Sequence, residues 1–211
     1  MKLLVTGATG GTGQAIIRLA IAQGHSVTAL VRSATKAAAL LPGATLVEGD
    51  ATDEAAILRG LGGSEAVISA LGTPMSPFRN VTLLSQATAA LVSAMQLQRV
   101  ARLVCITGMG AGDSKGHGGF FYDRIFQPLM LRKVYEDKDR QEAVIRASDL
   151  AWVIVRPTVL NDKPATGRIT ATIDLTNVHG GAIPRADVAA FVLEQLMGER
   201  WVGKTPLITA S

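Results

Sequence analysis

The stretch Val5-Thr6-Gly7-Ala8-Thr9-Gly10-Gly11-Thr12-Gly13 decides the fold of this chain. It follows a short apolar run that predicts a buried strand, and it precedes an apolar spacing that predicts a helix ending at Gly24. In such a turn the first glycine permits the tight bend, the second lets a pyrophosphate approach the backbone, and the third lets the helix pack on the strand. The helix N-terminus attracts the negative charge of the ligand. We therefore predict a dinucleotide site rather than a purely structural turn, built from Gly7, Thr9, Gly10, Gly11, Thr12 and Gly13.

Outward from this loop, short strands alternate with helices along most of the chain. The apolar pattern predicts strands over residues 2–6, 26–31, 45–48, 66–70, 103–106 and 152–155. It predicts helices over residues 12–23, 34–41, 53–60 and 80–98, and helical sequence up to about residue 147. This alternation is typical of an α/β fold with a Rossmann-type, doubly wound parallel sheet and right-handed crossovers.

The pattern changes after Pro157. Residues 168–175 predict a strand, residues 184–197 a helix and residues 206–209 a final strand. The length of 211 residues suits one α/β domain. We therefore expect a single NAD(P)-binding Rossmann domain over residues 1–211, in which residues 156–211 form a small C-terminal elaboration on the substrate side.

Composition and charge argue against several classes of protein. The chain is 48% hydrophobic and 18% charged, which is typical of a globular protein. Its net charge of +4 comes from scattered basic residues, which argues against a nucleic-acid partner. No apolar run reaches about 18 residues and no signal peptide is visible, so we expect no membrane partner.

The cysteine and histidine content adds two further expectations. Cys105 is the only cysteine, so no internal disulfide can form, and a reducing cytoplasmic location is expected. His25, His117 and His179 lack the spacing of metal ligands, so we expect no metal. We expect a monomer or a small homo-oligomer that acts on a small molecule.

The residues after the second predicted strand indicate which dinucleotide binds. Proteins that bind NAD place an acid here for the ribose 2′-hydroxyl, whereas proteins that bind NADP place an arginine for the 2′-phosphate. Here Arg32 follows the strand, Ser33 and Lys36 come next, and no acid lies between Gly24 and Glu48. A guanidinium suits a phosphate in geometry and charge, so we predict NADP(H) in preference to NAD(H). The alternative is that Arg32 and Lys36 are ordinary solvated charges.

Asp50 and Ala51 follow the third predicted strand. The Asp50 carboxylate is placed to accept a hydrogen bond from an adenine amino group. The alternative is that it caps the next helix, although Thr52 and Asp53 offer caps as well. We include Asp50 and Ala51 among the predicted cofactor-binding residues.

Five segments in this order, TGATGGTG, LVR, GDATD, ISALG and IPRADVA, resemble the atypical short-chain dehydrogenase/reductase superfamily. The chain is most similar to the NAD(P)H-binding branch that includes flavin reductase/biliverdin-IXβ reductase and NADH-flavin reductases. The resemblance implies that Ala70, Leu71 and Gly72 run beside the ribose and pyrophosphate of the cofactor. It also implies that four residues lie near the nicotinamide, namely Thr107, Gly108, Pro157 and Thr158.

The chain departs from this superfamily at the catalytic positions. Ordinary members carry a Tyr-x-x-x-Lys pair, in which the tyrosine is the general acid and the lysine binds the nicotinamide ribose. Lys138 fits the lysine position, which puts Val134 at the tyrosine position; Tyr135 is one residue away, about 100° round a helix. The usual serine position falls on Gly108, after Thr107. The candidate catalytic residues are therefore Lys138 and Thr107.

Three functions are compatible with these features. A reductase that transfers hydride from NADPH to a planar conjugated acceptor, such as a flavin, a quinone or a biliverdin-like molecule, needs no tyrosine because charge spreads over the ring system. A non-catalytic sensor of NADP(H) also needs none. An epimerase of nucleotide-linked sugars needs a larger C-terminal substrate domain than this chain offers. We predict the reductase and keep the sensor as the alternative.

The segment 109–134 is the expected wall of the substrate pocket. It is rich in glycine over residues 110–119 and is long enough to act as a lid. The aromatic and apolar residues that follow are expected to face either the substrate or the core: Phe120, Phe121, Tyr122, Phe126 and Met130.

Overall fold

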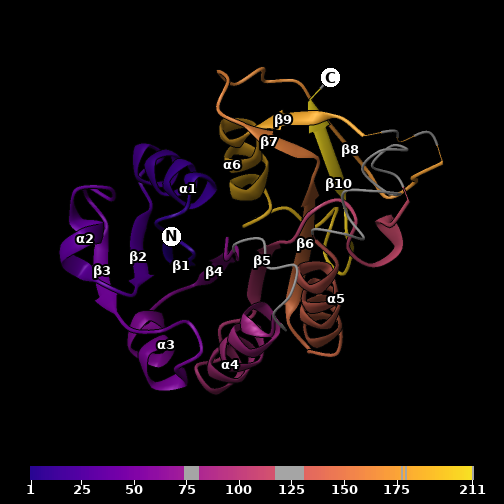
Figure 1. Ribbon diagram of the computed structural model, residues 1–211. Coiled ribbons are helices and arrows are strands. Elements are labelled where there is room, and N and C mark those ends of the chain that lie inside the picture. The colour runs from indigo at the N-terminus through magenta and orange to yellow at the C-terminus, as the bar shows by residue number, and fades with distance from the viewer. Residues whose placement is uncertain (74–80, 117–130, 177, 179, 211) are drawn as a thin grey trace.

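A central sheet of eight strands, with helices on both faces, organises the computed structural model (Figure 1). The structure describes residues 1–73, 81–116, 131–176, 178 and 180–210. The strands of the central sheet are β1 (Lys2–Thr6), β2 (Ser26–Val31), β3 (Thr45–Glu48), β4 (Ala66–Ser69), β5 (Arg102–Ile106), β6 (Ala151–Pro157), β8 (Ile169–Thr172) and β10 (Leu207–Ala210). The helices are α1 (Gly11–Ala22), α2 (Ala34–Ala38), α3 (Glu54–Leu61), α4 (Leu83–Leu97), α5 (Arg132–Arg146) and α6 (Arg185–Glu194), with a short 3₁₀ turn at η1 (Gly112–Ser114).

The strand order is β3-β2-β1-β4-β5-β6-β10-β8. All neighbouring pairs are parallel except the last, in which β8 runs antiparallel to β10. The order reverses between β1 and β4, and in open α/β sheets ligands bind at the carboxyl ends of the strands at such a point. The predicted doubly wound Rossmann fold is confirmed.

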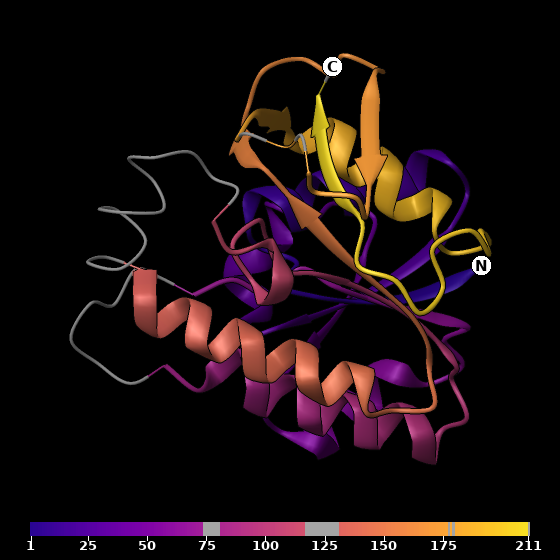
Figure 2. The same cartoon turned by 90° about the vertical axis from the view of Figure 1, so that its right-hand side faces the viewer.

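Helices bury both faces of the sheet. α1 and α6 pack on one face, and α3, α4 and α5 pack on the other, where α4 and α5 lie side by side (Figure 2). Consecutive strand residues therefore alternate between two cores: Leu3 and Val5 of β1 join the first core, and Leu4 joins the second. Burial on both faces explains why the inner strands read as unbroken apolar runs.

The first half of the chain folds as predicted, with small shifts at helix ends. β2 and β3 have the predicted bounds, and α3 begins after Asp53, whose side chain caps it by accepting from the Ala55 amide at 2.9 Å. The predicted helix 80–98 begins only at Leu83. Its first amides are capped from α5, because the Asp137 carboxylate accepts from the Leu84 amide at 2.8 Å.

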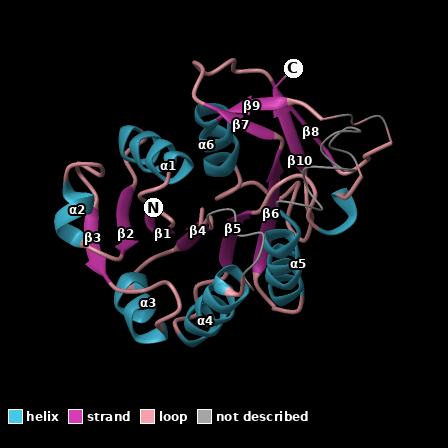
Figure 3. Ribbon diagram, in the orientation of Figure 1, coloured by secondary structure: helices cyan, strands magenta, loops and turns pink. Residues whose placement is uncertain are grey.

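The region after β6 contains a second, two-stranded sheet that was not predicted (Figure 3). It pairs β7 (Val159–Asn161) with β9 (Ala182–Pro184) in parallel, and β9 leads directly into α6. Asp187 in the first turn of α6 is buried and accepts from the Thr166 and Gly167 amides at 2.9 and 3.1 Å. This carboxylate fixes the loop before β8 to the start of α6. None of the helices in the described residues is long and apolar enough to cross a membrane.

Candidate functional site

A cleft of about 560 Å³ opens where β1 and β4 end and α1 begins. It brings together most of the predicted site residues: Gly7, Thr9, Gly10, Gly11, Thr12, Arg32, Asp50, Ala51, Ala70, Leu71, Gly72, Thr107 and Lys138. Six predicted residues do not line it: Gly13, Ser33, Lys36, Gly108, Pro157 and Thr158. Among the residues that the structure describes, nine others line the cleft that the sequence did not predict: Ala8, Leu30, Val31, Gly49, Thr73, Leu83, Ile106, Leu160 and Arg185.

The glycine-rich loop has the backbone shape that an anion site needs. Gly7 has a φ of +72°, and a Cβ there would overlap the carbonyl oxygen of Ala70. A Cβ at Gly13 would overlap the carbonyl oxygen of Gly7, so this glycine lets α1 pack against the turn. At Gly10, by contrast, the one contact of a Cβ with a described residue other than its chain neighbours is the Gly7 oxygen, at 3.4 Å.

The start of α1 fits a phosphate group. Gly10 is the N-cap residue and has no side chain to cap the helix, and the first turn holds no acid. The first amide groups of a helix have no partner within the helix, and they carry its partial positive charge. The residues present therefore fit the pyrophosphate of a dinucleotide.

Arg32 is the cation that lines the cleft at the end of β2, and the carboxylate of Glu48 lies close to this region. Arg32 is exposed, and no carboxylate of the described residues pairs with it. The Ser33 hydroxyl caps α2 by accepting from the Lys36 amide at 3.5 Å, and the Lys36 side chain is exposed outside the cleft. Glu48 at the end of β3 accepts from the Ala34 amide at 2.7 Å. This carboxylate brings a negative charge close to the predicted 2′-phosphate position.

Asp50 keeps its carboxylate charged in the cleft. It accepts hydrogen bonds from the Thr52 hydroxyl at 2.6 Å and the Thr52 amide at 2.9 Å. The Thr52 hydroxyl, more than the nearby Arg32 charge, holds the pKa of Asp50 below its usual value. The helix cap belongs to Asp53, so Asp50 remains available to a ligand.

Lys138 enters the cleft from α5 and meets the end of β5. Its Nζ donates to the carbonyl oxygen of Thr107, and burial lowers the pKa of Lys138 to about 8. Gly108 has a φ of +149°, and a Cβ there would lie 3.0 Å from the Lys138 Nζ. A serine at position 108 would crowd the ammonium group and would have to adopt this positive φ, so both observations favour glycine at that position.

Tyr135 lies close to Lys138, whose Nζ is 5.2 Å from the centre of its ring, but its hydroxyl has a main-chain partner. Val134 and Tyr135 are both buried, and the Tyr135 hydroxyl donates to the carbonyl oxygen of Met109 at 2.7 Å. The phenol proton is therefore engaged by the main chain, as expected for a residue that is one position away from the usual tyrosine.

The Thr107 hydroxyl belongs to a buried ionic network. It donates to the Glu142 Oε1 atom at 2.9 Å, and Glu142 also accepts two hydrogen bonds from Arg156, at 2.9 and 2.6 Å. Arg156 is 1% exposed and pairs in turn with Asp113 of η1 at 2.5 Å. Because it donates its proton to Glu142, the Thr107 hydroxyl has only lone pairs left for any other partner.

Arg185, the first residue of α6, reaches the glycine-rich loop from the C-terminal part of the chain. A Cβ on Gly11 would lie 2.9 Å from the Arg185 Nε, so the guanidinium lies against the loop. Its Nη1 donates to Asp162 at 2.7 Å. The segment IPRADVA contained this residue, but only the packing of α6 beside α1 brings it to the cleft.

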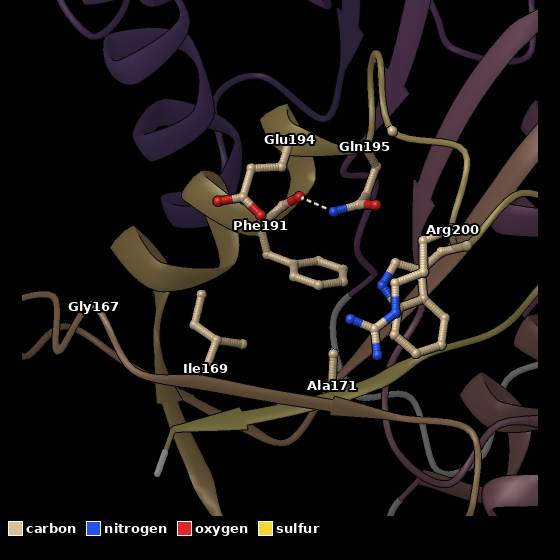
Figure 4. Close-up of a pocket in the computed structure, with 9 residues that line it drawn as sticks. Gly167, Ile169, Ala171, Phe191, Glu194, Gln195 and Arg200 are labelled. Carbon is tan, nitrogen blue, oxygen red and sulfur yellow. Dashed lines mark hydrogen bonds between the residues drawn. The ribbon is translucent and has the colours of Figure 1, made fainter.

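A second cavity of about 590 Å³ lies between β8 and α6 (Figure 4). The buried residues Phe191 and Trp201 line it, and the Arg200 guanidinium lies 4.8 Å from the centre of a Trp201 ring. No predicted site residue lines it. The cleft at α1 is therefore the candidate site.

Cys105 does not line this cleft. Cys105 is buried in β5, and burial raises the pKa of its thiol to about 12. Among the residues that the structure describes, no group of three or more metal-ligating side chains is assembled. Several predicted residues lie outside the described part of the chain: His117, Phe120, Phe121, Tyr122, Phe126, Met130 and His179.

Comparisons with known proteins agree with this geometry. The profile of a family described as NAD(P)H-binding matches residues 7–199. A Bacillus subtilis protein named "Uncharacterized sugar epimerase YhfK" is 30% identical over 204 residues, which cover 93% of this chain and 88% of the relative.

Solved structures share the fold. ChuY, described as an anaerobillin reductase from Escherichia coli, is 24% identical with a TM-score of 0.82, over 100% of this chain and 97% of that one. A short-chain dehydrogenase/reductase from Veillonella parvula in complex with NADP is 14% identical with a TM-score of 0.81, over 99% of this chain and 94% of that one. At these identities the likeness concerns the architecture alone.

Proposed function

Since this chain belongs to the NAD(P)H-binding family, we propose that it is an NADPH-dependent reductase of planar conjugated acceptors such as flavins, quinones or biliverdin-like molecules. The observation that carries the proposal is the Tyr135 hydroxyl bonded to the Met109 carbonyl beside a cleft that contains Lys138. A reduction of an isolated carbonyl needs a positioned acid for the developing alkoxide. A conjugated ring system spreads the charge and accepts its proton from water.

The residues of the cleft have distinct roles in this proposal. When bound, the reduced dinucleotide supplies the hydride. Lys138, whose side chain is protonated below about pH 8, holds the nicotinamide ribose. The Thr107 carbonyl oxygen fixes the position of its ammonium group. The apolar residues Leu83, Ile106 and Leu160 line the same cleft and offer a surface for flat rings. Residues 156–211 supply the substrate side of the domain.

The preference for NADPH is also a proposal. Arg32 lies at the end of β2 without an ion-pair partner among the described residues, so its guanidinium is available to a 2′-phosphate. Lys36 adds a nearby positive charge, whereas Glu48 opposes it. The proposed preference for NADPH over NADH depends on the balance between the positive charges of Arg32 and Lys36 and the negative charge of Glu48.

The test is steady-state oxidation of NADPH with four groups of acceptor: FMN, a quinone, biliverdin, and an aliphatic ketone or aldehyde. We expect turnover with at least one planar acceptor and none with the isolated carbonyl compounds. Turnover confined to the isolated carbonyls would refute the proposal. NADH replaces NADPH in a parallel series and measures the preference.

A sensor of NADP(H) state is the second candidate. The absence of a tyrosine at position 134 fits this function as well. Tight NADPH binding without turnover of any acceptor would support the sensor over the reductase. A nucleotide-linked sugar, incubated with the oxidised cofactor and analysed for its epimer, adds an arm for the activity in the name of the Bacillus subtilis relative.

A further inference from the structure

Arg185 supplies a positive charge that the glycine-rich loop itself lacks. Residues 7–13 contain no cation, and a dinucleotide brings two negative charges to the pyrophosphate. The partial charge at the start of α1 amounts to roughly half a unit, so it balances only part of them. Among the described residues that line the cleft, the cations are Arg32, Lys138 and Arg185.

These three cations lie at different parts of the cleft. Arg32 follows β2, where the 2′-phosphate is proposed to bind, and Lys138 contacts Thr107 at the opposite, nicotinamide side. Arg185 lies between these regions, with its Nε, Cδ and Cζ atoms 2.9, 3.0 and 3.6 Å from the position of a Cβ on Gly11. Gly11 is the first residue of α1. The guanidinium therefore lies beside the amide groups that face a phosphate.

The backbone at Arg185 is held in place, whereas its guanidinium group is accessible to a ligand. Two residues along α6, the buried Asp187 holds residues 166 and 167 against the helix. The Arg185 side chain itself is 27% exposed, and its partner Asp162 is 85% exposed. An ion pair with so exposed a carboxylate contributes little to stability, so a ligand can replace the carboxylate at small cost.

We infer that Arg185 is a further cofactor-binding residue that pairs with the pyrophosphate, exchanging Asp162 for the phosphate oxygens. A guanidinium offers parallel donors that match phosphate geometry. The C-terminal part of the chain thereby contributes directly to cofactor binding, beside the glycine-rich loop. This inference rests on the proposed placement of the dinucleotide in the cleft.

The test measures dissociation constants by calorimetry for NADPH, NADH and adenosine 2′-monophosphate, which has the 2′-phosphate but lacks the pyrophosphate. We expect Arg185→Gln to weaken NADPH and NADH alike, by about 10-fold or more, and to leave adenosine 2′-monophosphate unchanged. Arg168→Gln is the matched control, because Arg168 is an exposed arginine of the same region that does not line the cleft.

Two more variants test the exchange of partners. Asp162→Asn removes the competing carboxylate, so we expect it to tighten both dinucleotides by about two- to fivefold. Arg185→Lys keeps the charge and is expected to retain part of the affinity. Thermal melting of each variant shows whether it is folded, and the Asp162 variant leaves Arg185 in place should Arg185→Gln fail to fold.

Several results would overturn the inference. If Arg185→Gln and the Arg168→Gln control bound NADPH and NADH equally tightly, Arg185 would not be a cofactor-binding residue. Weaker binding in Asp162→Asn would make the ion pair structural. A raised KM for the acceptor with unchanged dinucleotide affinity would assign Arg185 to the substrate. If the wild-type chain bound neither dinucleotide, the proposed function would fail with it, whereas wild-type binding that is insensitive to Arg185 refutes only this inference.

Discussion

Replacing Lys138 by Met is expected to stabilise the folded protein while weakening its function. Burial lowers the pKa of Lys138 from its usual 10.5 to about 8, so the folded chain keeps the ammonium at neutral pH against an unfavourable desolvation. That difference in pKa corresponds to a cost on the order of 3 kcal/mol at pH 7. Methionine has a similar length and no charge, so the cost disappears. The lost hydrogen bond from the ammonium group to the Thr107 carbonyl offsets about 1.5–3 kcal/mol of the gain.

The pH dependence gives this prediction a definite sign. Between pH 8 and 10.5 the unfolded chain holds the Lys138 proton and the folded chain has released it, so the wild type gains stability as the pH rises. The Lys138→Met variant lacks this gain. We therefore expect the variant to be more stable by up to roughly 1.5 kcal/mol at pH 7, and the difference to shrink above pH 8.

Urea unfolding of both proteins from pH 7 to pH 10 measures the difference between their free energies of unfolding. The contributions of the other titrating groups cancel in this difference. NADPH titration of the same samples is expected to show weaker binding in the variant. In the wild type, NADPH affinity is expected to fall as the pH rises through about 8, where the ammonium loses its proton. A variant that is less stable than the wild type at pH 7, or a difference that does not change with pH, would refute the reasoning.

Four other substitutions test the remaining parts of the site. Arg32→Ala is expected to weaken NADPH by about 1.5–3 kcal/mol and to leave NADH nearly unchanged; equal losses for both would show that Arg32 does not contact the 2′-phosphate. Glu48→Gln removes the opposing charge, so the ratio of NADH to NADPH dissociation constants should rise, and a fall would contradict the proposed position of the phosphate. Gly10→Val should fold, since a Cβ meets no atom of the described residues beyond its chain neighbours closer than 3.4 Å, but lose both dinucleotides in titration; retained micromolar binding would place the pyrophosphate elsewhere. Tyr135→Phe should change turnover by less than about threefold and lower stability by about 1 kcal/mol through its lost bond to Met109, whereas a collapse of NADPH oxidation would restore a tyrosine-based mechanism.

The inner strands could be predicted because the cause of their structure is local. β2 is a run of apolar and β-branched residues bounded by turns, and its bounds agree with the prediction. The start of α4 could not be predicted in the same way. Its amides are capped by Asp137 of α5, which no pattern near Leu83 reveals. β7 and β9 contain three residues each, which is too short for a periodic pattern.

The candidate site also contains some features with a local cause, which could be predicted, and others that depend on tertiary contacts, which could not. The shapes at Gly7 and Gly13 follow from the order of residues in a single turn, so spacing alone predicts them. Arg185 and Glu48 belong to other elements, and they approach the cofactor side only because α6 packs beside α1 and β3 pairs with β2. Their contributions depend on tertiary contacts, for which the sequence carries no local signal.

The crowding between Gly108 and Lys138 limits how this scaffold can be redesigned. A tyrosine-dependent carbonyl reductase needs a tyrosine at Val134 and a hydroxyl at position 108 as well as the lysine. A serine at 108 would force an L-residue into a φ of +149° and would push against the ammonium group 3.0 Å away. An engineering route therefore has to reshape the backbone after β5 first, including the Met109 carbonyl that Tyr135 holds, and only then install the new side chains.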